Sequence, residues 1–428
     1  MPMTITLVII TAVLVIIGTP IAVSLGFASM IVLLFFQPVP NLLIIPQLFS
    51  EAATSFMMLA VPLFILTGAL MERGTVGRNL IDFTTSIVGW MTGGLGAVNI
   101  VGSMIFGGIS GSSLADSATF GSILVPRMVE DGYPKDYAGA VTLTSSCLSV
   151  VIPPSILLVL AAASTQQSVA KALAGGLLPG ILVTIMLLLP NYFIAKKHGY
   201  GSKVKFSLKH IGQKFLSCWT ALIAPIIILG TIFSGIVTPT EGAAVAVLYI
   251  LIIDGIIYRK LTLKDIADAL KSTAILTSAI LFIVTSSAIA NFIISFEHVP
   301  QFLAKMLLEM PGGTVGLLIL LDIILVLVGM TVDASPAIIV FTPLFLPIAV
   351  TAGIDPIHFL VLSVMGLALG LTTPPYGVCL FSIASVCNIS MQHLVRKALP
   401  FYVALIVALI LVTFIPQLSL FLPHILGL

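Results

Sequence analysis

The sequence predicts an all-α membrane protein with many spans, built from two related halves that are inserted in opposite orientations. Of its 428 residues, 59% are hydrophobic and only 8% are charged, and the mean hydropathy is +1.23. An ordinary soluble domain is about one quarter charged, so this composition places most of the chain in lipid. Two further observations, the placement of the basic residues and an internal repeat, predict the orientation and the duplication.

Twelve stretches have the composition of membrane-embedded elements. Each full span holds roughly the twenty apolar residues that a bilayer requires, or slightly fewer. The first, from Met3, lacks a basic leader and a small-residue cleavage site, which predicts a retained span. Two stretches carry a polar tip between apolar arms and predict re-entrant hairpins, at 93–126 and 314–351. The expected spans are 4–17, 20–36, 55–72, 137–164, 169–195, 215–233, 239–258, 273–296, 357–387 and 398–423.

The tip of the first hairpin is too polar for lipid and too apolar for a water-facing loop. The stretch from Phe106 to Pro126 contains a glycine-rich segment, six hydroxyl side chains and Asp116. Unsatisfied polar groups in hydrocarbon cost several kcal/mol each, so a lipid-facing helix cannot carry them. We therefore expect a tip that is buried in protein or lines a wet cavity.

The basic residues support the hairpin interpretation independently. If neither hairpin crosses and the N-terminus lies outside, 16 of the 18 lysines and arginines fall on the inner side. Only Lys171 and Lys305 fall outside, which is the bias that the positive-inside rule describes. A crossing hairpin would destroy this bias. Both termini are then expected on the outer side.

The basic stretch 196–214 divides the chain into halves that repeat. Gly18-Thr19-Pro20 recurs as Val237-Thr238-Pro239, and Pro153-Pro154 recurs as Pro374-Pro375, at offsets of 219 and 221 residues. The segment 64–67 recurs at 282–285, and the tip near Ser112 recurs near Asp333. Five crossings per half is an odd number, which predicts inverted repeats.

The predicted organisation follows from this repeat. The first half is 1–195, with scaffold helices at 1–72, a transport core at 93–164 and a helix at 169–195. The second half is 215–428, with scaffold helices and an arm at 215–296, a core at 314–387 and a helix at 398–423. The arm, from Arg259 to Thr273, has an amphipathic pattern that predicts a helix along the inner interface. Residues 41–53 occupy the corresponding place on the outer side, and both arms are expected to brace a fixed scaffold against a moving core.

Four polar interruptions at membrane depth carry the expected chemistry. Two are the hairpin tips, at 110–113 and 331–335. The others are Pro-Pro breaks within 145–155 and 370–377, because a proline pair splits a spanning helix in two. Broken helices expose carbonyls and hydroxyls that suit Na⁺, and N-terminal ends that suit a carboxylate. We expect two pseudo-equivalent cation sites with a substrate pocket between them.

Four acids are expected at membrane depth, where an acid is a functional candidate. Asp333, at the second tip, is the strongest. Asp116 begins a half-helix and is equally compatible with a structural role, Glu241 is best explained as a helix cap, and Asp322 is expected to pair with nearby hydroxyls. The four cysteines lack metal-ligand spacing, and we expect no cofactor.

Functions of other classes have less support. Gly108-Ile109-Ser110-Gly111 has the form found at the nucleophile of intramembrane serine proteases, but all six histidines are expected in loops or at span ends. The sequence contains neither HExxH nor a P-loop, so it does not indicate a metalloprotease or an ATP-driven pump. We therefore do not expect an enzyme. A channel is disfavoured because no ring of like residues is visible, and a one-component Na⁺- or H⁺-coupled carboxylate carrier stays an alternative.

Seven stretches spread over the chain carry a family resemblance: 61–74, 107–128 (GGISGSSLADSATFGSILVPRM), 133–146, 151–155 (VIPPS), 235–244, 330–348 (MTVDASPAIIVFTPLFLPI) and 370–377 (GLTTPPYG). They resemble the large membrane subunit of tripartite ATP-independent periplasmic (TRAP) transporters. The resemblance implies a Na⁺-coupled importer of organic acids in the bacterial inner membrane, with termini on the periplasmic side and an elevator mechanism like that of the ion-transporter superfamily. It also implies two partners: a small four-helix membrane subunit, expected as a separate chain, and a soluble periplasmic binding protein.

The resemblance also assigns site residues. One Na⁺ site is implied at Ser110, Ser112, Ser113 and the break around Val151 to Ser155. The other is implied at Thr331, Asp333, Ala334 and the break at Thr372, Thr373 and Pro374. Substrate-facing positions are Ser112, Pro154, Ser155, Asp333 and Pro375.

The substrate class is open between C4-dicarboxylates and sialic acid. No lysine or arginine is expected near the pocket, and Asp333 would repel a second substrate carboxylate unless Na⁺ intervened. This weakly favours a hydroxyl-rich monocarboxylate such as sialic acid.

Overall fold

The computed structural model describes residues 2–37, 42–73, 76–200, 207–302 and 312–428, and all regular secondary structure in these ranges is helical. The first half contains α1 (Pro2–Ile16), α2 (Ile21–Phe36), α3 (Ile44–Ala53), η2 (Phe56–Leu59), α4 (Ala60–Arg73), α5 (Val76–Val88), α6 (Gly94–Ser110), α7 (Ser113–Glu130), α8 (Lys135–Ser145), α9 (Leu148–Val151), α10 (Ile156–Ser164) and α11 (Val169–His198). The second contains α12 (Leu208–Phe233), α13 (Pro239–Ile250), the π-helical η3 (Leu251–Ile257), α14 (Leu263–Phe296), α16 (Gly313–Gly329), α17 (Ala334–Thr351), α18 (Pro356–Thr372), α19 (Val378–Val386), α20 (Met391–Phe414) and α21 (Gln417–Ile425).

The described helices confirm a polytopic α-helical membrane protein. Six are long and apolar enough to cross a bilayer, or eight if each of two bent pairs counts as one span. One bent pair is the predicted break, where α8–α9 and α10 meet at 43°. Helices α1, α2, α6, α16 and α18 are apolar but shorter.

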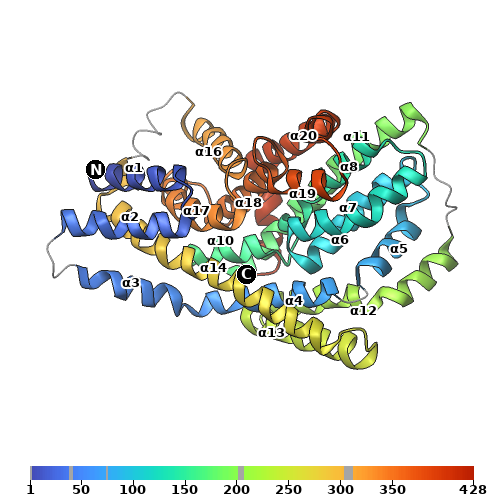
Figure 1. Cartoon of the computed structure of the whole chain (residues 1–428), viewed down its shortest axis with the longest axis horizontal. Helices are drawn as coiled ribbons and strands as arrows, with labels where there is room; N and C mark the ends of the chain where they lie inside the picture. Colours follow the sequence, from blue (N-terminus) through green and yellow to red (C-terminus); the bar gives the residue numbers. More distant parts are fainter. Residues whose placement is uncertain (1, 38–41, 74–75, 201–206, 303–311) are drawn as a thin grey trace.

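The helices form two groups (Figure 1). The frame helices are α1–α5 and α12–α14: α14 touches α1, α2, α3 and α4, while α13 packs on α4, and α12 packs on α13 and α5. The core helices, α6–α11 and α16–α21, pack around α18 and α8. Each half contributes to the core a helix–turn–helix (α6–α7 or α16–α17) followed by a helix that is broken at a Pro-Pro pair. The inverted relation of the halves and their division into scaffold and moving core stay predictions.

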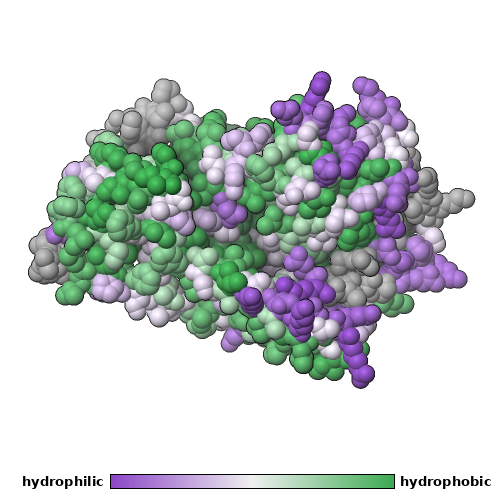
Figure 2. Space-filling model, in the orientation of Figure 1, coloured by the Kyte–Doolittle hydropathy of each residue, from purple (hydrophilic) through white to green (hydrophobic). Residues whose placement is uncertain are grey.

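Hydrophilic side chains gather at one end of the molecule (Figure 2). They lie around the ends of α5, α7 and α11 and the connection between α13 and α14. Asp82 on α5 pairs there with Lys214 at 2.8 Å and Arg127 at 3.6 Å, and Asp136 pairs with Lys397 at 4.0 Å. The predicted topology puts all the residues of these ion pairs on the inner side, and they lie together at this end of the molecule. Residues 201–206 and 303–311, which include Lys203, Lys205 and Lys305, lie outside the described residues.

The expected interface arm is not a separate element, which corrects the prediction for 259–273. It continues without a break into the span 273–296 as the 34-residue helix α14. A capping box between Thr262 and Asp265 starts this helix, and no glycine or proline interrupts it afterwards. At 1.5 Å per residue it is about 50 Å long, so part of it extends beyond a hydrocarbon core of about 30 Å.

Two smaller differences concern helices that the hydropathy pattern hid. Helix α5 was not predicted, because its threonines, Asn79 and Asp82 make it too polar for a span. The expected span 398–423 ends early, at Phe414, and α21 follows after Pro416. The outer arm is present as α3, although Asn41 lies outside the described residues.

Candidate functional site

The first tip is a tight turn between α6 and α7. Gly111 ends α6 with φ +61°, a left-handed conformation that glycine adopts without steric cost. Ser112 caps α7 and accepts the N–H of Ala115 at 3.3 Å. Ser110 and Ser113 on either side are buried, with 5% and 2% exposure. The sequence therefore places hydroxyl groups inside the protein, as expected.

The first tip packs directly on the first break. A side chain on Gly108 would lie 3.2 Å from the Pro153 carbonyl oxygen, and one on Gly111 would lie 3.1 Å from that of Pro154. Ser155 caps α10 by accepting the N–H of Leu158 at 3.2 Å, and its hydroxyl donates to the Val150 carbonyl. A Cβ atom at either position would be in tight contact with the break, and at Gly111 the positive φ favours glycine as well.

The second tip and the second break form an equivalent pair. Asp333 caps α17 and accepts the N–H of Ser335 at 2.9 Å. The N–H of Tyr376 donates to the Met330 carbonyl at 3.1 Å and joins the break to the tip. Both Pro-Pro bonds, Pro153-Pro154 and Pro374-Pro375, are cis. In each half, therefore, the tip faces the break of the same half.

The two tips meet at one small cavity of about 90 Å³, here named the central cavity. The first tip contributes Gly111, Ser112 and Ser113, and the second contributes Asp333, Ala334 and Ser335. The remaining lining is apolar apart from a thiol: Leu114, Val150, Ile156, Leu157, Leu276, Ile280, Leu371, Val378 and Cys379. Two regions that are 221 residues apart in sequence thus share one site.

The chemistry of this cavity suits a small anion together with a cation. The capped N-terminal turns of α7 and α17 end at the cavity and place the positive ends of two helix dipoles beside it. Asp333 is the one ionisable carboxylate in the lining, and the described lining contains no lysine, arginine or histidine. A carboxylate with serine hydroxyls provides the hard oxygen ligands that Na⁺ prefers.

The predicted site residues divide into three sets. Ser112, Ser113, Asp333 and Ala334 line the central cavity. Ser110, Val151, Ser155, Thr372 and Thr373 are buried behind it, and the hydroxyls of the last three donate to carbonyls of their own segments. The other three do not line it: Thr331, Pro154 and Pro375.

Helix α14 supplies two lining residues that sequence reasoning missed, Leu276 and Ile280. They are ordinary apolar positions in a long apolar helix, so no local signal marks them. Ser335 and Cys379 were also missed as lining residues. Ser335 is the last residue of the predicted tip 331–335 but was not assigned to the site, and its polar side chain at a half-helix start was the available signal.

The other three acids have separate roles. Glu241 is exposed and forms a capping box with Thr238, whose N–H it accepts at 2.8 Å. Asp322 accepts the hydroxyl of Thr413 at 2.7 Å, which confirms the expected pairing with a hydroxyl. Asp116 is fully buried in α7 and does not line the central cavity.

The protease alternative finds no support at Ser110. The hydroxyl of Ser110 accepts the N–H of Ser112 at 3.4 Å. His358, the buried histidine of the described residues, lies instead beside Ser419 at 2.7 Å. A nucleophile needs a base within reach, and the described residues place none beside Ser110.

Comparisons with known proteins point to one family of transporters. Residues 8–418 match the family model described as "Tripartite ATP-independent periplasmic transporter, DctM component". The sialic acid TRAP transporter large permease protein SiaM of Vibrio cholerae is 34% identical over 407 residues, which are 95% of each chain. The C4-dicarboxylate TRAP transporter large permease protein DctM of Pseudomonas aeruginosa is 36% identical over 404 residues, 94% of each chain. The crystal structure of the Alcanivorax borkumensis YdaH transporter shares the fold, with a TM-score of 0.61, 16% identity and 87% coverage of both chains.

Proposed function

Because the chain belongs to the DctM family of tripartite ATP-independent periplasmic transporters, we propose that it imports an organic acid across the inner membrane by coupling uptake to Na⁺. It is a transporter permease and not an enzyme. The observation that supports the proposal best is the convergence of both polar tips on one cavity.

The charge of the central cavity supports the proposed Na⁺ coupling. An organic acid must approach Asp333, and without a cation the two carboxylates repel each other. The described lining offers no basic side chain to offset this repulsion. A Na⁺ ion held by serine hydroxyls, backbone carbonyls or Asp333 removes the penalty, so anion and cation bind together. The implied cation residues behind the cavity, such as Thr372 and Ser110, belong to this proposal.

The size of the cavity supports a moving core. A volume of about 90 Å³ holds about three water molecules at ~30 Å³ each, which is too small for sialic acid. The cavity lies between α14 of the frame and the tips of the core, so a shift of the core relative to α14 opens it. This geometry fits an elevator mechanism, in which the core carries the solutes past the frame.

The substrate class rests on relatives and on charge. The relatives are named for sialic acid and for C4-dicarboxylates. A single acidic side chain beside two helix N-termini suits one substrate carboxylate better than two. We therefore propose a hydroxyl-rich monocarboxylate of the sialic acid class, with C4-dicarboxylates as the second candidate.

The proposed transporter complex includes two partner proteins. The tripartite family name fits a small membrane subunit and a soluble periplasmic binding protein beside this chain. The frame helices expose large apolar side chains, among them Phe27, Phe35 and Leu34 on α2, that a membrane subunit or lipid can cover. The N- and C-termini are proposed to lie on the periplasmic side.

The proposal is tested in proteoliposomes that contain both membrane subunits, with the binding protein added outside. Uptake of radiolabelled sialic acid or succinate is measured with an inward Na⁺ gradient and without ATP. We expect uptake only when Na⁺, the small subunit and the binding protein are all present. Equal uptake after choline replaces Na⁺ would contradict the coupling, and uptake by this chain alone would favour a one-component carrier.

A further inference from the structure

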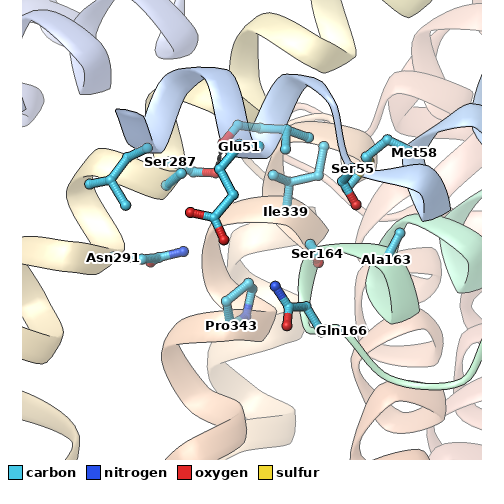
Figure 3. Close-up of a pocket in the computed structure, with 14 residues that line it drawn as sticks. Glu51, Ser55, Met58, Ala163, Ser164, Gln166, Ser287, Asn291, Ile339 and Pro343 are labelled. Carbon is cyan, nitrogen blue, oxygen red and sulfur yellow. Dashed lines mark hydrogen bonds between the residues drawn. The ribbon is translucent and has the colours of Figure 1, made fainter. Parts of the chain in front are cut away.

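A second cavity lies between the frame and the core, and its polar lining has no role in the proposed site. It has a volume of about 200 Å³ and is here named the outer cavity. Figure 3 shows Glu51 of α3, Asn291 of α14 and Gln166, which follows α10, with their polar ends directed toward the same space. Ser55, Ser164 and Ser287 add hydroxyls to the lining.

The outer cavity lies along the same seam as the central cavity. On α14, the central cavity is lined by Ile280 and the outer cavity by Asn291, eleven residues or about 16 Å further along the helix. On α17, the corresponding residues are Ser335 and Pro343, about 12 Å apart. Helix α10 links the cavities in the same way, from Leu157 to Ser164. The two cavities are therefore successive spaces on one route.

Apolar side chains lie where the two cavities adjoin: Leu157 and Ile280 line the central cavity, and Val284 and Ile339 line the outer cavity. Ile280, Val284, Leu157 and Ile339 are all less than 10% exposed and come from α14, α10 and α17. The outer cavity lies at the turn between α10 and α11 and at the α3 arm. The predicted topology places both of these on the outer side of the membrane. A solute that enters from the periplasm reaches the outer cavity first.

The charge and the ligand atoms of the outer cavity select a cation. Glu51 is the one ionisable side chain in the described lining, so the cavity carries a single negative charge. The amides of Asn291 and Gln166 and the serine hydroxyls present neutral oxygens around it. Among the described residues, no hydrogen bond joins the side chains of Glu51, Asn291 and Gln166 to one another, which leaves them available to a solute. Hard oxygen ligands of this kind suit Na⁺, and the described lining contains no cationic side chain that would repel the ion.

We propose that the outer cavity is an external waypoint that holds a hydrated Na⁺ before the ion reaches the central cavity. This inference rests on the proposed Na⁺-coupled function. The volume fits a hydrated ion, because about 200 Å³ accommodates roughly six waters at ~30 Å³ each. Glu51 attracts the ion, and Asn291 and Gln166 orient its water shell from the frame and from the core.

The test measures the external Na⁺ concentration that gives half-maximal uptake in proteoliposomes of the complete complex, with choline keeping the ionic strength constant. Glu51→Gln is expected to raise this concentration about fivefold, the size expected for one nearby charge in a water-filled site, with little change in the maximal rate. Asn291→Asp adds a carboxylate and is expected to lower it. Glu241→Gln is the matched control, because glutamine keeps the capping box while it removes an exposed acid outside both cavities.

Three results would overturn the waypoint. The first is an unchanged Na⁺ dependence in Glu51→Gln while the wild type depends on Na⁺. The second is an equal shift in Glu241→Gln, which would show a general surface-charge effect. The third is a shift in the half-saturating concentration of the organic acid while that of Na⁺ stays unchanged. If Glu51→Gln loses uptake altogether, Asn291→Asp decides, because misfolding cannot raise Na⁺ affinity. Wild-type uptake that is indifferent to Na⁺ would instead defeat the proposed coupling itself.

Discussion

The two tips occupy equivalent places in the sequence but differ in their surroundings. At the first tip, Ser110 and Ser113 are buried, and the adjoining break from Val151 to Ser155 is buried as well. At the second tip, Thr331 and Asp333 are exposed, and Pro375 and Tyr376 of its break are exposed too. The first tip carries only hydroxyls, whereas the second carries the acid.

This difference indicates that the two tips have different roles. The first tip and break form a packed, pre-shaped wall whose polar groups are fixed by neighbouring backbone. The second tip and break form the accessible wall, where a charged side chain can meet a solute. Two copies of one motif therefore need not give equal sites, because what packs against each copy decides how far it is exposed.

The largest expected effect tests what the two tips share, a backbone contact that admits only glycine. A Cβ on Gly107 would lie 2.5 Å from Cα of Ser149, and one on Gly370 would lie 2.4 Å from the carbonyl carbon of Gly329. Gly107→Ala and Gly370→Ala should each destabilise the protein by about 1–3 kcal/mol or more. Thermal unfolding of purified protein measures this.

Gly230→Ala is the control for these variants, because no atom within 4 Å would meet its Cβ. It should unfold at or slightly above the wild-type temperature. If Gly107→Ala is as stable as Gly230→Ala, the first tip does not pack on its break as described.

The next effect separates the charge of Asp333 from its capping role. Asp333→Asn keeps a side chain that caps helices well, so folding should be preserved. We expect uptake to fall more than about tenfold, the factor that corresponds to ~1.4 kcal/mol. Asp333→Ala should add a stability loss of about 1 kcal/mol from the missing cap. Normal uptake by Asp333→Asn would show that the charge of Asp333 has no role in transport and that the two tips are more alike than we propose.

A smaller effect contrasts two serine caps, of which only one lines the central cavity. Ser112→Ala should raise the half-saturating concentration of Na⁺ or substrate severalfold, because its hydroxyl lies in the cavity lining. Ser155→Ala should mainly cost about 1 kcal/mol of stability, because its hydroxyl is buried and already bonded to Val150 and Leu158. Uptake titrations and thermal unfolding of both variants check the contrast. The reverse pattern would mean that Ser155 faces the solute.

The smallest expected effect concerns Ser335, which was not predicted to line the site. Its hydroxyl lines the central cavity, while its N–H is already held by Asp333. Ser335→Ala should change uptake by about two- to threefold, because a weak neutral hydrogen bond contributes about 0.5 kcal/mol, which corresponds to roughly a twofold change. A loss as large as that of Asp333→Asn would show that the second tip binds through hydroxyls and not through charge.

The sequence alone predicted the parts of the fold that polarity and proline mark. The tips at 110–113 and 331–335 and both Pro-Pro breaks stand out because such residues cannot face lipid or continue a helix. The capping function of Glu241 followed from Pro239 beside it. These signals are local, so they can be recognised without knowing which other segments of the chain pack against them.

The rest depended on packing between distant segments. The role of α14 at the central cavity, through Leu276 and Ile280, has no local mark, because one apolar face looks like another. The inward bonds of Ser155 depend on the geometry of the break itself. The exposure difference between the two tips comes from their neighbours, such as α4, whose Gly68 lies against Ser110. Helix α5 was missed because its threonines and Asp82 lower its hydropathy, although it packs against α6 and α12.

The most direct test of the account is whether one solute protects both tips at once. Ser112→Cys and Ser335→Cys place a thiol on opposite walls of the central cavity; both are made in a Cys379→Ser background, because Cys379 lines the same cavity, and the other three native cysteines are buried outside it. We expect a water-soluble thiol reagent to label both positions, and Na⁺ together with the transported acid to slow labelling at both. Labelling only by lipid-soluble reagents, or protection at one position and not the other, would contradict a single solute cavity between the two tips.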